Sequence, residues 1–104
     1  MDLRGTSVGN VGLKEVARLS GLRYLELCQT KVTDEGLKEL AALTELQRLG
    51  LNSTAVTGAG LKHLVPLKKL QLLNLSDTKV TETDVAALKK ALPACQISHG
   101  ALVQ

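Results

Sequence analysis

Two histidines and two cysteines are the residues of this chain whose types most often carry out catalysis or bind metal ions. Cys95 and His99 stand in a Cys-x-x-x-His spacing, but this pair supplies only two ligands, whereas a structural zinc site needs four. No carboxylate or nucleophile is placed beside His63 by the sequence pattern described below. We therefore expect no catalytic residue, no metal site and no cofactor.

A row of evenly spaced lysines, Lys14, Lys38 and Lys62, is the feature closest to a site for phosphate or nucleic acid. Glu15 and Glu39 follow the first two lysines, so acidic groups offset much of this positive charge, and the net charge of the chain is only +3. The chain has one Tyr and no Phe or Trp, and therefore lacks aromatic side chains on which bases could stack. These observations argue against a nucleic-acid partner.

Neither the interior nor the start of the chain resembles a membrane segment. No apolar run reaches the length of about 18 residues that a membrane-spanning helix requires. The first residues, MDLRGTSVGN, lack the apolar core of a signal peptide. If Met1 is the native start, we expect a cytoplasmic protein that contacts no membrane, and a secreted parent protein is the alternative.

The dominant feature of the sequence is a repeat of 24 residues, which places residues of one type in columns. The threonine column holds Thr6, Thr30, Thr54 and Thr78. Further columns hold Leu25, Leu49, Leu73 and Ile97, then Leu27, Leu51 and Leu75, and then Leu13, Leu37, Leu61 and Val85. A unit this small cannot bury its apolar face alone, so the units are expected to stack and share one core.

Within each unit, the spacing of the apolar residues changes from that of a strand to that of a helix. The segments LRYLEL, LQRLGL and LQLLNL end with leucines at every second position, which indicates a strand with one buried face. In VTDEGLKELAAL the apolar residues follow a helical spacing. Thr33, Thr57 and Thr81 stand where a helix N-cap is needed, and Asp84 resembles the partner in a capping box. Gly9 replaces this threonine in the first unit. We therefore expect the N-terminus of that helix to be the least stabilised of the four.

The threonine column just after each strand is expected to bond loop backbone between neighbouring turns. With these residues in view, the sequence resembles the leucine-rich repeat family, whose strand hallmark is L-x-x-L-x-L. The V-T-D-x-G-L continuation looks like the 24-residue bacterial type and is similar to the cysteine-containing subfamily. Two features depart from the family pattern: threonine stands where Asn or Cys is usual, and Asp84 stands in a column of glycines.

The resemblance implies an α/β fold, a right-handed leucine-rich-repeat solenoid with a parallel concave sheet and convex helices. We expect one domain over residues 1–104, with a partial first repeat at 1–21 and full repeats at 22–45, 46–69 and 70–93. Residues 94–104 would form a closing strand around Ile97 and a tail, because Pro93 ends the last helix. The chain enters in mid-unit, so we expect a fragment of a longer array or an open end that pairs with another molecule.

The two cysteines are expected to be free thiols. Cys28 belongs to the strand of the second unit and Cys95 to the closing strand. Three strand spacings of roughly 4.8 Å put them about 14 Å apart, whereas a disulfide needs Cα atoms within about 7 Å.

The residues that alternate with the buried leucines should line the concave face, where the resemblance implies that a protein partner binds. They vary in chemistry while the buried columns do not. The expected partner-binding residues are Tyr24, Glu26, Cys28, Arg48, Asn52, Leu72 and Asn74. Tyr24 beside Arg48 is the best candidate for a contact centre, because both types are favoured anchors at interfaces.

A purely structural role for the same residues is the alternative. Tyr24 could cover the backbone of the neighbouring strand while Arg48 pairs diagonally with Glu26. Gly50 leaves a gap among these side chains, which could admit a side chain of a partner or have no function. Leu72, exposed beside Arg48, would add a small apolar element.

The sequence favours a protein–protein recognition module within a longer array or a larger regulatory protein. A second hypothesis is self-assembly, in which the apolar N-terminal repeat stacks against another copy of the chain. That end would present Leu3, Val8, Leu13, Val16 and Leu19. A third hypothesis is a substrate adaptor of a ubiquitin ligase or a bacterial effector.

Overall fold

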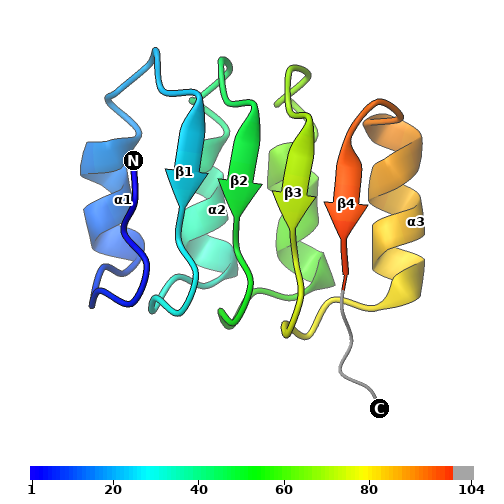
Figure 1. Cartoon of the computed structure of the whole chain (residues 1–104), viewed down its shortest axis with the longest axis horizontal. Coiled ribbons are helices and arrows are strands. Elements are labelled where there is room, and N and C mark those ends of the chain that lie inside the picture. Colours follow the sequence, from blue (N-terminus) through cyan, green and yellow to red (C-terminus); the bar gives the residue numbers. More distant parts are fainter. Residues whose placement is uncertain (100–104) are drawn as a thin grey trace.

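The computed structural model describes residues 1–99 and shows a parallel four-stranded sheet with helical segments packed against one of its faces (Figure 1). In chain order the elements are α1 (Asn10–Val16), β1 (Tyr24–Glu26), α2 (Asp34–Leu40), β2 (Arg48–Gly50), the 3₁₀-helix η1 (Gly58–Leu64), β3 (Leu72–Asn74), α3 (Glu82–Ala91) and β4 (Gln96–Ser98). The expectation of an α/β fold with a parallel sheet is confirmed. Residues 100–104, which belong to the expected closing segment, lie outside the described residues.

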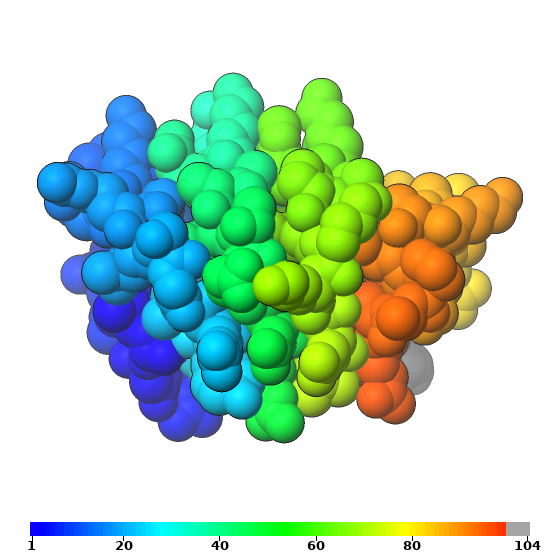
Figure 2. Space-filling view, turned by 90° about the horizontal axis from the view of Figure 1, so that it is seen from above, coloured from blue at the N-terminus to red at the C-terminus, as the bar shows by residue number. Residues whose placement is uncertain are grey.

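The strands follow one another across the sheet in sequence order, and each pair is parallel. Leu25 pairs with Leu49, Leu49 with Leu73 and Leu73 with Ile97, so the pairing follows the 24-residue spacing at every step. A view along the strands shows the units lying side by side from the N-terminus to the C-terminus (Figure 2). Because each strand lies beside the next one in the chain, a single helical crossover connects them on one face.

The first residues of the chain extend this arrangement beyond β1. The Glu26 N–H donates to the Met1 carbonyl, and the Leu3 N–H donates to the Glu26 carbonyl, both at 2.9 Å. The Gly5 N–H donates to the Cys28 carbonyl at the same distance. Leu3 therefore has the strand register that its column predicts.

The core between the sheet and the helices is built from aliphatic side chains. Leu25, Leu49 and Leu73, on the inner side of the strands, are at most 2% exposed. Leu37 and Leu40 of α2 face them and are fully buried. Burial of one leucine side chain stabilises the fold by about 1.5–3 kcal/mol. Neighbouring units bury each other's leucines, so this stabilisation depends on their stacking.

A tight turn follows each of the first three strands and is stabilised by the threonine column. Gln29, Ser53 and Asp77 adopt the left-handed conformation, with φ of 59°, 58° and 56°. The Thr30 and Thr54 hydroxyls, one residue later in each turn, donate to the carbonyl three residues before them, at 2.7 and 2.6 Å. The expectation that this column bonds neighbouring turns is therefore wrong, because each hydroxyl closes the turn of its own unit.

Neighbouring units are joined by a side chain that caps the next helix. The Thr33 N–H donates to Oδ1 of Asn10 at 3.0 Å, and Nδ2 of Asn10 donates to the Thr33 hydroxyl at 2.7 Å. One unit later, the Thr57 N–H and hydroxyl donate to the two oxygens of Asp34 at 2.8 and 2.6 Å. The threonines do occupy the N-cap positions, but the Thr33 hydroxyl makes no bond to its own helix.

A glycine in the following helix makes room for each of these side chains. A Cβ atom on Gly36 would collide with the amide oxygen of Asn10. A Cβ atom on Gly60 would collide in the same way with the carboxylate of Asp34. The glycine column therefore reflects the space needed by a polar side chain of the preceding unit.

The third junction reverses this arrangement. Gly58 stands where the earlier units have Asn10 and Asp34, and the side chain is supplied instead by Asp84 in the following helix. The Thr81 N–H donates to Asp84 Oδ2 at 3.0 Å, and the Asp84 N–H donates to the Thr81 hydroxyl at 3.2 Å. This is the capping box that the sequence indicates. A Cβ atom on Gly58 would collide with the Asp84 carboxylate, so glycine and acid have exchanged places.

The least regular helical segment is η1 rather than the first helix, although the first helix has no side-chain cap at its start, as the sequence indicates. The first unit, with Gly9 at its N-cap, forms a regular α-helix. The third unit instead forms the 3₁₀-helix η1, although the Thr57 hydroxyl accepts the Ala59 N–H at 3.2 Å. Glycines at positions 58 and 60 lower the helix propensity of its first turn, which explains this difference.

Gly58→Asp should destabilise the protein, and adding Asp84→Gly should reverse most of the loss. The single substitution places two carboxylates in one space, at a cost of about 1–3 kcal/mol in the free energy of unfolding. The double variant restores the arrangement of the first two junctions. Urea unfolding of both single variants and the double variant measures the coupling, and additive effects would contradict the exchange.

The capping box also predicts a pH dependence. The backbone N–H of Thr81 and then its hydroxyl hold the pKa of Asp84 below its ordinary value of 3.8. A lowered pKa means that the ionised carboxylate stabilises the fold, fully so above pH 3.8 and less as the pH falls through the lower folded value. The stability difference between wild type and Asp84→Asn should therefore shrink in strong acid, and a difference that stays constant would contradict this assignment.

Candidate protein-binding surface

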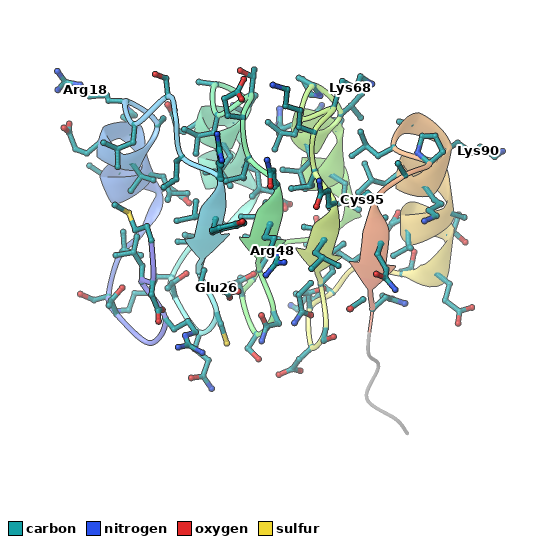
Figure 3. All side chains as sticks on the ribbon, turned by 45° about the horizontal axis from the view of Figure 1, so that its top comes forward. Arg18, Glu26, Arg48, Lys68, Lys90 and Cys95 are labelled. Atoms are coloured by element: carbon teal, nitrogen blue, oxygen red, sulfur yellow. The ribbon has the colours of Figure 1, made fainter. Side chains whose placement is uncertain are left out.

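The sheet face that carries no helices, called here the open face, presents two rows of side chains across the strands (Figure 3). The first row consists of Tyr24, Arg48, Leu72 and Gln96, and the second of Glu26, Gly50, Asn74 and Ser98. Strand pairing sets both rows in register, as the repeat predicts, so side chains that are far apart in the sequence become neighbours.

Tyr24 and Arg48 contact each other at the β1 end of the first row. The guanidinium carbon of Arg48 lies 5.1 Å from the centre of the Tyr24 ring, which is a cation–π arrangement. Tyr24 nevertheless remains 50% exposed. Within residues 1–99, Arg48 makes no ion pair with Glu26. The alternative of a diagonal Arg48–Glu26 pair is therefore wrong, because the guanidinium stacks on the ring instead.

The expected gap at Gly50 is filled by a side chain of the neighbouring strand. Gly50 is buried, and a Cβ atom added to it would collide with the carboxylate of Glu26. The Glu26 side chain therefore crosses from β1 over the backbone of β2. The glycine admits a side chain of this chain itself, which corrects the expectation of an open gap.

A shallow hollow of about 240 Å³ lies beside this crossing. Its charged and polar walls are Glu26, Arg48, Asn74 and Ser98, and Leu72 forms an apolar wall that is itself 39% exposed. Four strands thus contribute to one depression in the open face. Ser98 was not among the expected binding residues, although its place 24 residues after Asn74 could have indicated it.

Two expected binding residues, Cys28 and Asn52, do not line this hollow. They lie just after β1 and β2, where Nδ2 of Asn52 donates to Sγ of Cys28 at 3.0 Å. Beside them, Arg4 pairs with Asp2 at 2.7 Å. The structure therefore brings together Tyr24, Glu26, Arg48, Leu72 and Asn74, and places Cys28 and Asn52 in a separate contact at one end of the strands.

The two histidines lie in different parts of the fold, on η1 and just after β4. His63 is half-buried on η1, while Nε2 of His99 lies 3.0 Å from the Val80 carbonyl oxygen. Cys95 is buried and, like Cys28, forms no disulfide. Within the described part of the chain, no three His, Cys, Asp or Glu side chains are grouped as metal ligands, and no helix is long and apolar enough to cross a bilayer.

Of the five residues expected at the N-terminal end, four are at least partly covered by the chain itself, although the same unit exposes Val11 (80%) and Met1 (46%). Leu13 and Val16 are buried within the chain, and Leu3 and Val8 are half-buried. Leu19, at 44% exposed, is the only one of the five expected residues that is largely open to solvent. In addition, the Arg4 N–H donates to Asp2 Oδ1 at 3.1 Å, so a local side chain already occupies one donor of this edge.

Comparison with known proteins gives matches among solved structures, whereas no protein-family model and no curated sequence matches the chain. Subunits of Chaetomium Mex67:Mtr2 superpose with a TM-score of 0.75 at 20% identity, over 99% of this chain and 80% of that one. Actin-binding site 2 of leiomodin-1 gives a TM-score of 0.74 at 14% identity, over 99% and 70%. The likeness to both is one of fold.

A leucine-rich repeat protein of Leptospira interrogans is also among the similar structures. It has a TM-score of 0.58 and 27% identity, and the match covers 82% of this chain but 27% of that one. The structural neighbours therefore include a leucine-rich repeat protein, of which this chain spans about a quarter.

The two cysteines should differ strongly in reactivity. Burial raises the pKa of the Cys95 thiol, whose side chain is only 1% exposed, so it holds little thiolate and is shielded from reagents. Cys28 is half-buried and reachable. With Ellman's reagent, Cys95→Ala should react at least about tenfold faster than Cys28→Ala, and the difference should disappear in urea. Equal rates in the folded state would contradict the burial of Cys95.

Proposed function

We propose that this chain is a leucine-rich-repeat solenoid of the 24-residue bacterial type, without enzymatic activity, that binds a protein partner on its open face. The repeat columns and the strand pairing at the same spacing support the solenoid. Similarity to a leucine-rich repeat protein supports the same assignment. In this proposal the open face is the concave side of the solenoid.

The observation that carries the binding proposal is the stacked pair of Tyr24 and Arg48 beside the exposed Leu72. Tyr and Arg are the types most often found at the energetic centres of interfaces. Here they are held by paired strands and by each other, yet Tyr24 is half exposed. A pair that is already ordered loses little entropy when a partner binds.

The other structural neighbours are compatible with this role. One belongs to the Mex67:Mtr2 assembly, and another is an actin-binding site. Similar folds therefore occur in proteins whose names refer to protein partners. Self-assembly through the N-terminal end is the second candidate: four of the five side chains expected there are at least partly covered, but Met1, Val11 and Leu19 of the same unit are exposed.

Tyr24→Ala and Arg48→Ala should each weaken partner binding by at least about tenfold, which corresponds to about 1.4 kcal/mol. The immobilised chain is exposed to lysate, bound proteins are identified by mass spectrometry, and affinities are then measured with the purified partner. Lys38→Ala is the matched control, since Lys38 lies on α2 and its ammonium group, among residues 1–99, pairs only with the exposed Glu35.

Urea unfolding of each variant separates lost binding from lost folding. The cation–π contact contributes about 0.5–1 kcal/mol, so both alanine variants should remain folded. Binding that tolerates both substitutions but is abolished by Lys38→Ala would overturn the assignment of the open face.

A further inference from the structure

We infer that the hollow in the open face receives a lysine or arginine side chain of the protein partner, with Glu26 as its ionic contact. This inference rests on the proposed function and specifies the chemistry of the partner. Three observations support it: the Glu26 carboxylate makes no ion pair within the described residues, it lies over Gly50, and Leu72 forms an apolar wall of the hollow.

Glu26 is the acid of the open face whose carboxylate makes no hydrogen bond or ion pair within the described residues. The pKa of Arg4 is raised first by its bond to Asp2 and to a smaller extent by the charge of Glu26. Asp2, the acid beside it in the same row, forms a bidentate pair with Arg4 at 2.7 and 2.9 Å. Arg48 is stacked on Tyr24. No hydrogen bond or ion pair within residues 1–99 reaches the Glu26 carboxylate. A cation from outside would therefore gain an ion pair without breaking an existing one.

Gly50 determines where this carboxylate lies. The Glu26 side chain lies over the glycine of β2, so its oxygens lie above the neighbouring strand and line the hollow. A larger residue at position 50 would block this path. Glu26 of β1 consequently lines the same hollow as Leu72 and Asn74 of β3 and Ser98 of β4.

The remaining walls fit a long amphipathic side chain. Leu72 offers apolar surface, against which the aliphatic part of a lysine or arginine can pack while its charged head reaches the carboxylate. The volume of the hollow, about 240 Å³, is compatible with one such side chain. Arg48 also lines the hollow, with its guanidinium stacked on the Tyr24 ring. The cation of the partner is therefore expected on the Gly50 side of the hollow, where the Glu26 carboxylate lies.

Selection from a random peptide library displayed on phage, with the full chain as the target, tests this inference. Peptides selected by wild type should be enriched in Lys or Arg next to apolar residues. Glu26→Gln should weaken the best peptide by at least about tenfold, and added salt should weaken it on wild type. Gly50→Ala keeps the charge but displaces the carboxylate, and should weaken the same peptide. Glu45→Gln is the control, because Glu45 pairs with Lys69 at 2.9 Å and lies outside the hollow.

The outcomes separate this inference from the proposed function. Acidic peptides, or basic peptides that bind Glu26→Gln unchanged, would overturn the inference; the proposed function would stand if Tyr24→Ala still abolishes binding. Peptides that ignore Tyr24 and Arg48, or no selected peptides at all, would overturn both. A dimer in light scattering that Glu26→Gln dissociates would make a second copy the occupant and would also overturn the inference.

Discussion

The fold depends on one set of backbone hydrogen bonds that recurs between neighbouring units. The N–H groups of Leu3, Leu27, Leu51 and Leu75 each donate to a carbonyl 23 residues further along the chain, at 2.7–2.9 Å. An added residue in one unit would break this register and remove a leucine from the shared core. The buried columns therefore barely vary, because each residue is fixed by two neighbours in space as well as by its own unit.

The same register determines which side chains are neighbours on the open face. Side chains above a paired backbone stand at fixed distances, so Tyr24 can lie against Arg48 although 23 residues separate them in the chain. The absence of a side chain at Gly50 then lets Glu26 lie across the neighbouring strand. A single small residue in an otherwise regular row thus brings Glu26 to the wall of a depression that four strands share.

The sequence predicts the periodic part of this molecule and misses the contacts between units. Strand positions, rows of the open face and N-cap sites all follow from the spacing of leucine and threonine. The Asn10–Thr33 bond and the Arg48–Tyr24 stacking do not, because the repeat predicts which residues are adjacent but not which rotamers they adopt. One sequence pattern does indicate the contacts between units: a polar residue and a glycine stand 26 positions apart at each junction. The pairs are Asn10 with Gly36, Asp34 with Gly60, and Asp84 with Gly58.

At the third junction the glycine, Gly58, comes first and the acid, Asp84, second, which is the reverse of the two earlier junctions. The repeat units therefore cannot replace one another. If residues 46–69 were deleted, Asp34 would meet Asp84 across the new junction, and two carboxylates would compete for the N–H of Thr81. In the intact chain, Gly36 makes room for Asn10 and Gly60 makes room for Asp34. The deletion removes Gly60, so no glycine would remain opposite Asp34. Arrays of this kind are expected to grow or shrink by whole units, but here the side chains between units specify their order. A chain without its third unit would keep the 24-residue period, but it would lose the pairing of a capping side chain with a glycine at the new junction.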